Sequence, residues 1–350
     1  MRFIHIADVH LGAAPDGKSS WSEARKKEIW DTFRSTIQDA GKEQVDLLLI
    51  AGDLFHRQPL MEELKEVNYL FSTLNHTRVV LMAGNHDYLQ PASGYLNFPW
   101  SRNVACLFSR QCECVRFPEI RTFVYGFSYY RQEIPEPLYE GLHPVKEEGC
   151  HILLAHGGDG QHIPISRDSL SRSGFDYVAL GHIHKPQAVI KDQALYAGAL
   201  EPVDCNDFGP HGYILGNWEK GRIKARFVRK AKREYIPLTL SVEEGDTTFS
   251  LRDKLEQEIE KTGWQHIYRV SLQGKREPGS SFDLEKLMEF GMVLDVEDET
   301  VPAFHLEELK RRYQGQMIGR YIESFEGHER SITEEKALQY GLEALLSQER

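Results

Sequence analysis

Five apolar runs in this 350-residue sequence end in the same way, because each stops at a short cluster of polar residues. The clearest is LLLIAGDLFH, Leu47–His56, in which five apolar residues lead to Gly52 and then to Asp53. Continuous apolar runs of this kind are typical of parallel strands that are buried on both faces. Ligands of open α/β sheets collect beyond the carboxyl ends of such strands. The pattern therefore predicts an α/β protein with its functional groups gathered at one edge of its sheets.

The polar clusters share one kind of chemistry. In chain order they are Asp8-x-His10, Gly52-Asp53, Gly84-Asn85-His86-Asp87, Ala155-His156-Gly157 and Gly181-His182-x-His184. Their carboxylate, amide and imidazole donors, with no thiolate, suit a catalytic divalent metal ion better than a structural zinc ion. The candidate ligands are Asp8, His10, Asp53, Asn85, His156, His182 and His184. Seven donors are too many for one ion, but one shared carboxylate would give two ions four ligands each.

Other segments supply the frame around these runs. Apolar spacing predicts helices at Ser22–Gly41 and Met61–Leu74. Shorter alternating segments at 104–107, 112–116 and 121–127 predict antiparallel strands. Strand patterns return at 186–190, 194–197, 211–218 and 222–228. This mixture predicts an α/β sandwich whose mixed sheets are covered by helices, over residues 1–233.

The last third of the chain differs in charge and in rhythm. Residues 1–233 hold 28 basic and 28 acidic side chains, whereas residues 234–350 hold 14 and 25, so the whole net charge of −11 lies in the later part. Residues 234–301 alternate as β-α-β-α-β, which predicts a small α+β domain. Residues 302–350 are helical in pattern, with a helix from His305 and a second over about Thr333–Ser347.

Composition limits the cellular context. No run of 18 apolar residues occurs, so we expect no membrane span. The N-terminal MRFIHIADVH has the wrong proportions for a signal peptide and is interpreted as a first strand. The five cysteines are an odd number in a long chain, which favours reduced thiols and a cytoplasmic location.

The order D-x-H, G-D, G-N-H-D, H, G-H-x-H resembles that of the calcineurin-like metallophosphoesterases, over about residues 1–230. The resemblance implies a two-sheet α-β-β-α sandwich in which Asp53 bridges two metal ions. One ion would take Asp8, His10, Asp53 and His184, and the other Asp53, Asn85, His156 and His182. His86 would protonate the leaving oxygen or stabilise its charge while hydroxide attacks phosphorus in line. We expect two divalent ions, Mn²⁺ first, with Fe²⁺, Zn²⁺ or Mg²⁺ as alternatives.

Within that family the chain is most similar to the nuclease branch, which includes the SbcD-type exonuclease subunits of DNA double-strand-break repair. Phosphoprotein phosphatases carry G-D-x-x-D-R-G, whereas here His56 replaces the second Asp, and the stretch YAGALEPVDCNDFGPHGY resembles the nucleases. This resemblance implies DNA as substrate, a DNA-capping domain at 234–301, a homodimer and an SbcC-type coiled-coil ATPase as partner. His56 would then orient His86 or contact a DNA phosphate, unless it only caps its turn.

Several alternatives stay open. The same fold could serve a small-molecule or cyclic-nucleotide phosphodiesterase, or a non-catalytic scaffold, and the acidic cap is awkward for a DNA surface. Four basic residues share one strand face and either bind the phosphate backbone or solvate an edge strand: Lys220, Arg222, Lys224 and Arg226. The helix at 61–74 could pack in the core or pair two copies of the chain. The C-terminal helices could dock the ATPase or pack on each other.

Overall fold

The computed structural model of the protein describes residues 1–347, which divide into two compact units, Met1–Tyr235 and the residues from Ile236 onward. The first unit contains two sheets of six strands each. The first sheet consists of β1 (Arg2–Ile6), β2 (Leu47–Ala51), β3 (Arg78–Met82), β4 (Val104–Cys106), β11 (Gly212–Glu219) and β12 (Arg222–Arg229). They are ordered β12-β11-β1-β2-β3-β4, with β1, β2 and β3 parallel.

The second sheet lies against the first. It consists of β5 (Glu113–Phe117), β6 (Thr122–Gly126), β7 (Cys150–His156), β8 (Tyr177–Gly181), β9 (Gln187–Ile190) and β10 (Ala194–Tyr196). Their order is β5-β6-β7-β8-β10-β9, and β7 runs parallel to both β6 and β8. A single 3₁₀ turn, Pro118–Ile120, joins β5 to β6.

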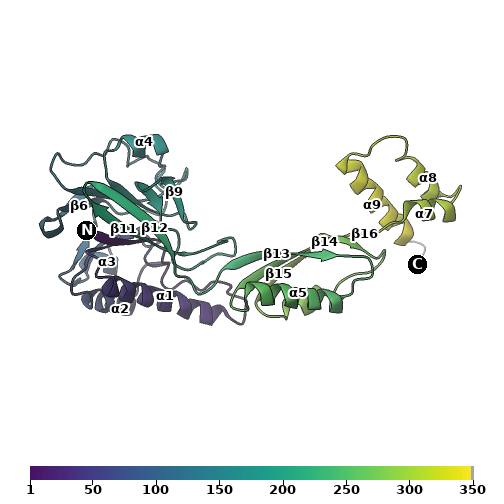
Figure 1. Cartoon of the computed structure of the whole chain (residues 1–350), viewed down its shortest axis with the longest axis horizontal. Coiled ribbons are helices and arrows are strands. Elements are labelled where there is room, and N and C mark those ends of the chain that lie inside the picture. Colours follow the sequence, from purple (N-terminus) through teal and green to yellow (C-terminus); the bar gives the residue numbers. More distant parts are fainter. Residues whose placement is uncertain (348–350) are drawn as a thin grey trace. The chain divides into compact units, whose positions relative to one another are not determined.

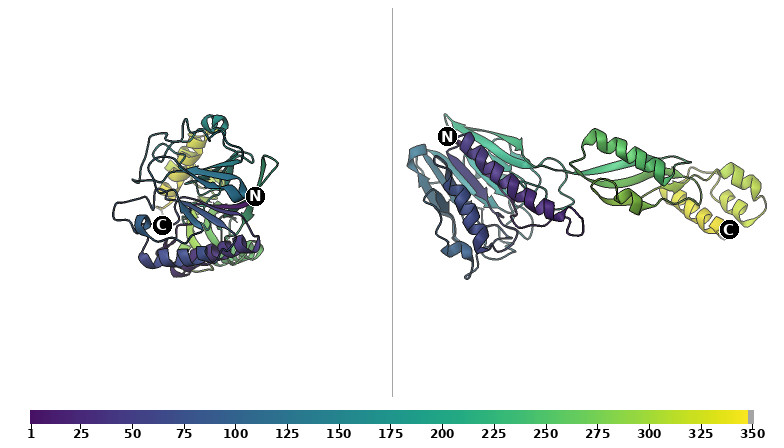
Figure 2. Two further views of the ribbon diagram at one scale, coloured as in Figure 1. Left: turned by 90° about the vertical axis from the view of Figure 1, so that its left-hand side faces the viewer. Right: turned by 90° about the horizontal axis from the view of Figure 1, so that it is seen from below.

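Helices cover the outer faces of both sheets. The helices α1 (Ser22–Lys42), α2 (Met61–Ser72) and α3 (Gly94–Asn97) lie on the first sheet, and α4 (Arg167–Arg172) lies on the second (Figures 1 and 2). Alternate residues of β2 explain the layering, because Leu48 and Ile50 pack against the helices whereas Leu47 and Leu49 pack against the second sheet. The predicted α-β-β-α sandwich is therefore confirmed.

One prediction about strand direction is wrong. The segment 104–107 was expected to be antiparallel, but β4 pairs parallel with β3. The segment 121–127 is antiparallel to β5 on one side and parallel to β7 on the other. β4 is a three-residue edge strand whose residues are all half-buried, so its lack of a long apolar run reflects its place at the edge rather than its direction.

The second unit opens with an alternation of strands and helices. Its elements are β13 (Tyr235–Val242), whose first residue still belongs to the first unit, α5 (Thr248–Thr262), β14 (Ile267–Arg276), α6 (Leu284–Met288), β15 (Val293–Asp298) and β16 (Val301–Pro302). The sheet order is β13-β14-β15, and β16 pairs with β14. α5 runs along this sheet (Figure 2), and its residues Leu251, Leu255 and Ile259 join the sheet residues in one core.

Between residues 302 and 347 the C-terminal segment forms three helices rather than the two expected. They are α7 (Leu306–Arg312), α8 (Met317–Glu323) and α9 (Ile332–Ser347). Gly315, in the left-handed conformation with φ of 74°, interrupts the expected first helix. Ile318 and Ile322 of α8 pack against Leu338 and Leu342 of α9. The predicted apolar stripes therefore largely cover each other.

All five cysteines are free thiols, as predicted. Among the helices of residues 1–347, none combines the length and the apolar character that crossing a membrane requires.

Candidate metal centre

The predicted ligands from five strand ends converge on one polar centre in the first unit. Ligand atoms of Asp8, His10 and His184 lie within 4.8 Å of one another, and so do those of Asp8, Asp53 and His156. The hydrogen bond of 2.9 Å between His156 Nδ1 and the Ala51 carbonyl joins the ends of β7 and β2. The two sheets therefore contribute to the same site.

The first group of donors gathers around His10. Its Nε2 lies 3.1 Å from Nε2 of His184 and 3.9 Å from Oδ2 of Asp53. Asp8 is fully buried, and both of its carboxylate oxygens accept the backbone N–H of His182, at 3.0 and 2.9 Å. Two carboxylates and two imidazoles thus face one small volume.

The second group gathers around the side-chain oxygen of Asn85. This Oδ1 lies 2.8 Å from His156 Nε2 and 3.2 Å from His182 Nδ1. Oδ2 of Asp53 lies 3.4 Å from His156 Nε2. Because the same oxygen also faces His10, Asp53 stands between the two groups, as a bridging ligand must.

Hydrogen bonds outside the centre orient its histidines. His184 donates Nδ1–H to the Asp207 carboxylate, at 3.0 Å, and His156 donates Nδ1–H to the Ala51 carbonyl. Each ring therefore turns its Nε2 to the centre, and in the neutral ring that atom carries the lone pair. Outer partners of this kind fix the tautomer of metal-binding histidines and raise their basicity.

The glycines beside the polar residues are required because other atoms of the site lie where a Cβ atom would stand. A Cβ added to Gly84 would lie 2.2 Å from Oδ1 of Asp53, and one added to Gly181 would lie 2.1 Å from the Ala51 carbonyl oxygen. Gly52 has a φ of 86°, and its Cβ would lie 2.4 Å from Nδ1 of His156. The recurrent glycine in the sequence pattern is thus explained by the side chains that meet there.

Four of the seven candidate ligands have strained backbones. Asp8, His10, Asp53 and His182 have positive φ angles of 49°, 51°, 50° and 98°. Such conformations are uncommon outside glycine and concentrate at functional sites, where the surrounding structure enforces them. Here the strain turns side chains inward at the strand ends.

The pKa values of the buried carboxylate and imidazole groups shift in directions that suit a site for divalent cations. Burial opposes ionisation of Asp53, but the imidazoles of His156 and His10 hold its pKa below the usual range. Burial would lower the pKa of His156, yet Asp53 raises it to about 9. For His184 the same contest between burial and Asp207 raises the pKa to about 9. Protons on these imidazoles thus balance buried carboxylates, and divalent cations bound there would release them.

At three other ligands, burial has the largest effect on the pKa. It raises the pKa of Asp8 to about 6, lowers that of His182 to about 4 and lowers that of His10 well below its ordinary value. Histidines that remain neutral at neutral pH are ready to act as ligands. The donor set therefore fits divalent metal ions.

The two proposed catalytic histidines lie at the rim. The His86 ring lies 4.7 Å from the His10 ring, and its backbone N–H donates to Asp53 Oδ1 at 2.8 Å. His86 Nδ1 lies 3.2 Å from the carbonyl oxygen of His56, and the two rings stack at 5.2 Å. His56 is exposed and places its Nδ1 3.4 Å from Nδ1 of His10.

Four neighbouring residues were not assigned from the sequence. Asp207 holds His184, and Asp159 holds both His182 and His162. Asp87 accepts hydrogen bonds from Phe55 and Gly84 backbone N–H groups and from the Tyr95 hydroxyl. Burial raises the pKa of Asp87 to about 7. Asp87 and Asp207 stand inside quoted motifs, which was a usable signal, whereas nothing in the sequence marked Asp159 or His162.

The four basic candidates lie away from this centre. Lys224 pairs with Asn217, which pairs with Arg2 at the first residue of β1, whereas Asp8 follows the last. At about 3.4 Å per residue, roughly 20 Å of strand separates Arg2 from Asp8. Lys224, with Lys220 and Arg222 farther along the same hairpin, therefore does not reach the metal centre, and Arg226, opposite Leu215 and Ile4, lies about 14 Å of strand from Asp8.

Comparison with known proteins places the first unit in a family. The family model described as calcineurin-like phosphoesterase matches residues 1–186, more than half of the chain. The chain belongs to the calcineurin-like phosphoesterases. Its phosphoesterase domain, which indicates a phosphoester hydrolase, contains every one of the strand-end clusters described above.

Proteins similar to the chain include a DNA repair protein and a nuclease subunit. The chain is 29% identical to the uncharacterized metallophosphoesterase YhaO of Bacillus subtilis, over 78% of the chain and 72% of the relative. It is 29% identical to the DNA double-strand break repair protein Mre11 of Methanocaldococcus jannaschii, over 59% of the chain and 58% of the relative. It is 27% identical to the SbcD component of the SbcCD nuclease of Staphylococcus epidermidis, over 57% and 61%. The chain thus matches little more than half the length of the last two relatives.

Proposed function

We propose that this calcineurin-like phosphoesterase is a two-metal phosphodiesterase that cleaves DNA, as an exonuclease or endonuclease subunit in DNA repair. The observation that carries the proposal is the position of Asp53, whose Oδ2 faces His156 at 3.4 Å and His10 at 3.9 Å. One carboxylate therefore serves two groups of donors. Paired ions about 3.5–4 Å apart suit phosphoryl displacement, because they stabilise both the attacking and the leaving oxygen.

The proposed ligand sets follow the two groups. The first ion is assigned Asp8, His10, Asp53 and His184, and the second Asp53, Asn85, His156 and His182. We assign Mn²⁺, with Fe²⁺, Zn²⁺ and Mg²⁺ as the ions to compare. When bound, such ions lower the pKa of water and stabilise negative charge on oxygen.

His86 is proposed to act on the leaving oxygen. It is not needed for either ligand set, and its carbonyl-bound Nδ1 leaves Nε2 for the substrate. We expect His86→Ala to keep both metal equivalents and to lower kcat by about 10²–10⁴, the usual value of a positioned acid. Metal analysis beside kinetics decides this, because loss of an ion together with activity would make His86 a ligand. His56, which stacks on His86, is proposed to hold that ring in place.

The substrate class is tested directly. The protein with Mn²⁺ is incubated with end-labelled duplex DNA and, separately, with a small phosphodiester, and EDTA and His86→Ala serve as controls. We expect cleavage of both, with higher kcat/KM for DNA. Cleavage of the small ester alone would favour a small-molecule or cyclic-nucleotide phosphodiesterase. Absence of both activities in protein that binds metal would favour a scaffold.

A basic groove on the first sheet is proposed to hold DNA beyond the cleavage site. The stretch from Lys220 to Arg233 contains eight basic residues, of which four form ion pairs with acidic side chains of the first unit: Arg229–Glu234, Lys230–Asp39, Lys232–Asp31 and Arg233–Glu28. The other four form none within residues 1–347: Lys220, Arg222, Lys224 and Arg226. Unpaired cations attract a phosphate backbone.

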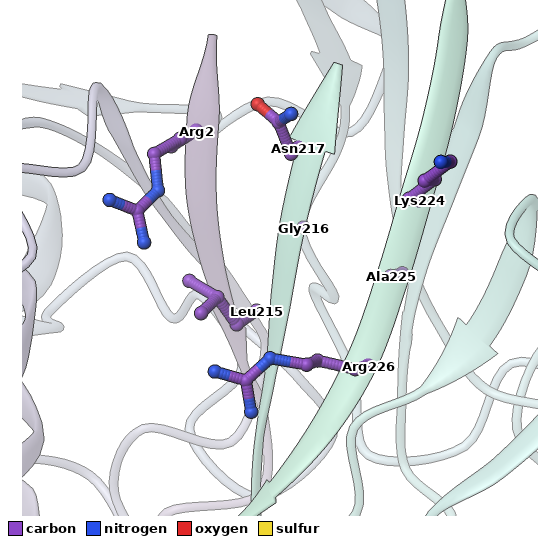
Figure 3. A pocket seen from close by; sticks show the side chains of 7 residues that line it. All are labelled: Arg2, Leu215, Gly216, Asn217, Lys224, Ala225 and Arg226. Carbon is purple, nitrogen blue, oxygen red and sulfur yellow. The ribbon is translucent and has the colours of Figure 1, made fainter. Parts of the chain in front are cut away.

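The groove is lined by side chains of β1, β11 and β12. Lys224 and Arg226 project from β12 beside Arg2 and Asn217, and the Arg226 side chain reaches across β11 towards β1 (Figure 3). We expect Lys224→Glu with Arg226→Glu to weaken duplex binding in EDTA and to flatten its dependence on salt, while cleavage of the small ester is unchanged. Lys146→Glu with Arg172→Glu, exposed elsewhere on the unit, is the matched control. If the two double variants bind duplex DNA with equal affinity, the basic face of β12 only solvates an edge strand.

We propose the C-terminal helices as the docking site of an SbcC-type ATPase. Because α8 and α9 share one core, the surface for a partner is the set of apolar side chains left outside it, namely Met317, Ile332 and Tyr340, which are 68%, 77% and 69% exposed. Truncation after Pro302 is expected to abolish ATPase binding and to spare cleavage of the small ester. Retained binding would refute docking, and unfolding would assign these helices to the fold.

A homodimer through α2 completes the proposal. Leu64, Val67 and Phe71 of α2 are buried in the core, whereas Met61 and Tyr69 are 52% and 68% exposed. Tyr69→Glu is expected to shift the molecular mass measured by light scattering from dimer to monomer; a monomeric parent protein would refute the pairing. We place the protein in the cytoplasm, as the free cysteines favour. Residues 234–301 are proposed to act as a DNA-capping domain.

A further inference from the structure

A tight loop follows β7 and runs from Gly157 to Ile163. Its ends are fixed, because Gly158 N–H donates to the His162 carbonyl at 2.9 Å and Ile163 N–H donates to the Ile134 carbonyl at 2.6 Å. The Tyr196 hydroxyl donates to the Gly157 carbonyl at 2.9 Å. The loop is therefore held against the second sheet beside the metal centre.

Asp159 is the hub of this loop. Its Oδ1 accepts the backbone N–H groups of Gln161 and His162, at 2.7 and 2.8 Å. Its Oδ2 accepts Nε2–H of His182 at 2.8 Å and Nδ1–H of His162 at 2.9 Å. One carboxylate thus fixes the turn and two imidazole rings.

The contact with His182 determines which nitrogen of that ring is left for metal. Nε2 donates to Asp159, so Nδ1, which lies 3.2 Å from Asn85 Oδ1, carries the lone pair. A cation held between Asp159, His162 and His182 is the alternative, since their ligand atoms lie within 4.8 Å. It would require His182 to lose both ring protons while Nδ1 serves the second ion, so hydrogen bonding is favoured.

The contact with His162 places a further histidine at the rim. The His162 ring lies 4.5 Å from the His182 ring, and the His86 ring lies 4.7 Å from the His10 ring. Each of the two ligand groups therefore has at least one histidine outside its ligand set, namely His162 beside His182 and both His86 and His56 beside His10. Nδ1 of His162 is engaged by Asp159, which leaves Nε2 as the atom that a substrate oxygen can reach.

We propose that Asp159 is a positioning residue that turns Nδ1 of His182 to the second metal ion and holds His162 to contact the phosphate of the substrate. This inference rests on the two-metal function proposed above and deepens it. Asp207 has the matching role at His184, where its carboxylate accepts Nδ1–H at 3.0 Å and leaves Nε2 for the first ion. His182 would then bind the second ion through Nδ1, whereas His184 would bind the first ion through Nε2.

Asp159→Asn tests the first part. Asparagine can keep the turn, because its oxygen still accepts the backbone N–H groups, but its NH₂ facing His182 would favour the tautomer with a proton on Nδ1. We expect one of two Mn²⁺ equivalents to bind about 10–100-fold more weakly by titration calorimetry, with the melting temperature of the metal-free protein unchanged. Asp168→Asn, an exposed carboxylate on α4, is the matched control.

His162→Gln tests the second part. We expect both Mn²⁺ equivalents to bind as in the parent protein, while KM for the small phosphodiester rises by about tenfold, as for one hydrogen bond to a charged group. An unchanged KM would refute the substrate contact.

The outcomes separate this inference from the proposed function. Asp159→Asn with both equivalents at parental affinity overturns the positioning role. A weakened equivalent in a protein that does not cleave DNA supports positioning and refutes the DNA assignment. Failure of the parent protein to bind two equivalents refutes the two-metal proposal, and the positioning role with it.

Discussion

A buried histidine outside the proposed ligand set makes the first unit sensitive to acid. His5 lies on β1, fully buried, and its Nδ1 is 3.0 Å from the hydroxyl oxygen of Tyr177 on β8. The ring thus sits between the two sheets, where desolvation by burial lowers its pKa from 6.5 to about 3. Below pH 6.5 the unfolded chain therefore binds a proton that the folded chain does not, and stability falls as the pH falls towards 3.

The size of the effect follows from the two pKa values. Each tenfold change in proton affinity corresponds to about 1.4 kcal/mol, so this residue alone costs at most about 5 kcal/mol of folding free energy at low pH. Between pH 7.5 and pH 5 the loss is about 2 kcal/mol, because protonation of the unfolded chain is then nearly complete and that of the folded chain has barely begun.

The assay is urea unfolding of parent protein and His5→Asn at both pH values, in EDTA, followed by tryptophan fluorescence. Asparagine can still accept from Tyr177 but does not titrate. His5→Asn is expected to be less stable at pH 7.5 through lost packing, and to lose about 2 kcal/mol less than the parent on going to pH 5. His76→Asn, which removes an exposed imidazole of the same unit, is the control. Equal pH dependence of parent and His5→Asn would refute the reasoning.

Three further substitutions test the ligand cage and the fold around it. Asp53→Asn should weaken both Mn²⁺ equivalents together in calorimetry, and loss of one alone would contradict bridging. Gly84→Ala should also weaken metal binding, because its Cβ would lie 2.2 Å from Asp53 Oδ1, whereas Gly17→Ala, with no atom within 4 Å of the new carbon, should bind as before. Arg25→Met should lower the free energy of unfolding by about 3–5 kcal/mol, because it leaves the carboxylate of fully buried Glu201 without its cation; additional Glu201→Leu should restore much of the loss in urea unfolding.

The strand ends illustrate what local sequence determines. Five apolar residues from Leu47 specify a strand buried on both faces, and Gly52 with Asp53 mark its end. The helices at Ser22 and Met61 were likewise predictable, because an apolar stripe of period 3.6 specifies both the helix and the face it buries. Period and turn chemistry are properties of neighbouring residues, so the sequence alone contained them.

The hydrogen-bond and ion-pair partner of a side chain, by contrast, often lies far away in the sequence. Asp207 and Asp159 hold ligands 23 residues away, and only the arrangement of the strands brings them together. The same applies to Lys230, which pairs with Asp39 across 191 residues, while Lys224 forms no ion pair in the part of the chain that the structure describes. Both lysines belong to one basic stretch, and nothing local distinguishes them.

The C-terminal helices show the same division. Their apolar stripes were evident from spacing, but spacing could not state whether α8 covers a partner or α9. The structure places Ile322 against Leu342 and leaves Met317 outside. Periodicity fixes which side chains share a helix face, because that depends on backbone geometry within a few residues. Which surface meets that face is decided by tertiary packing, because the burial of apolar area is non-directional and accepts any complementary neighbour.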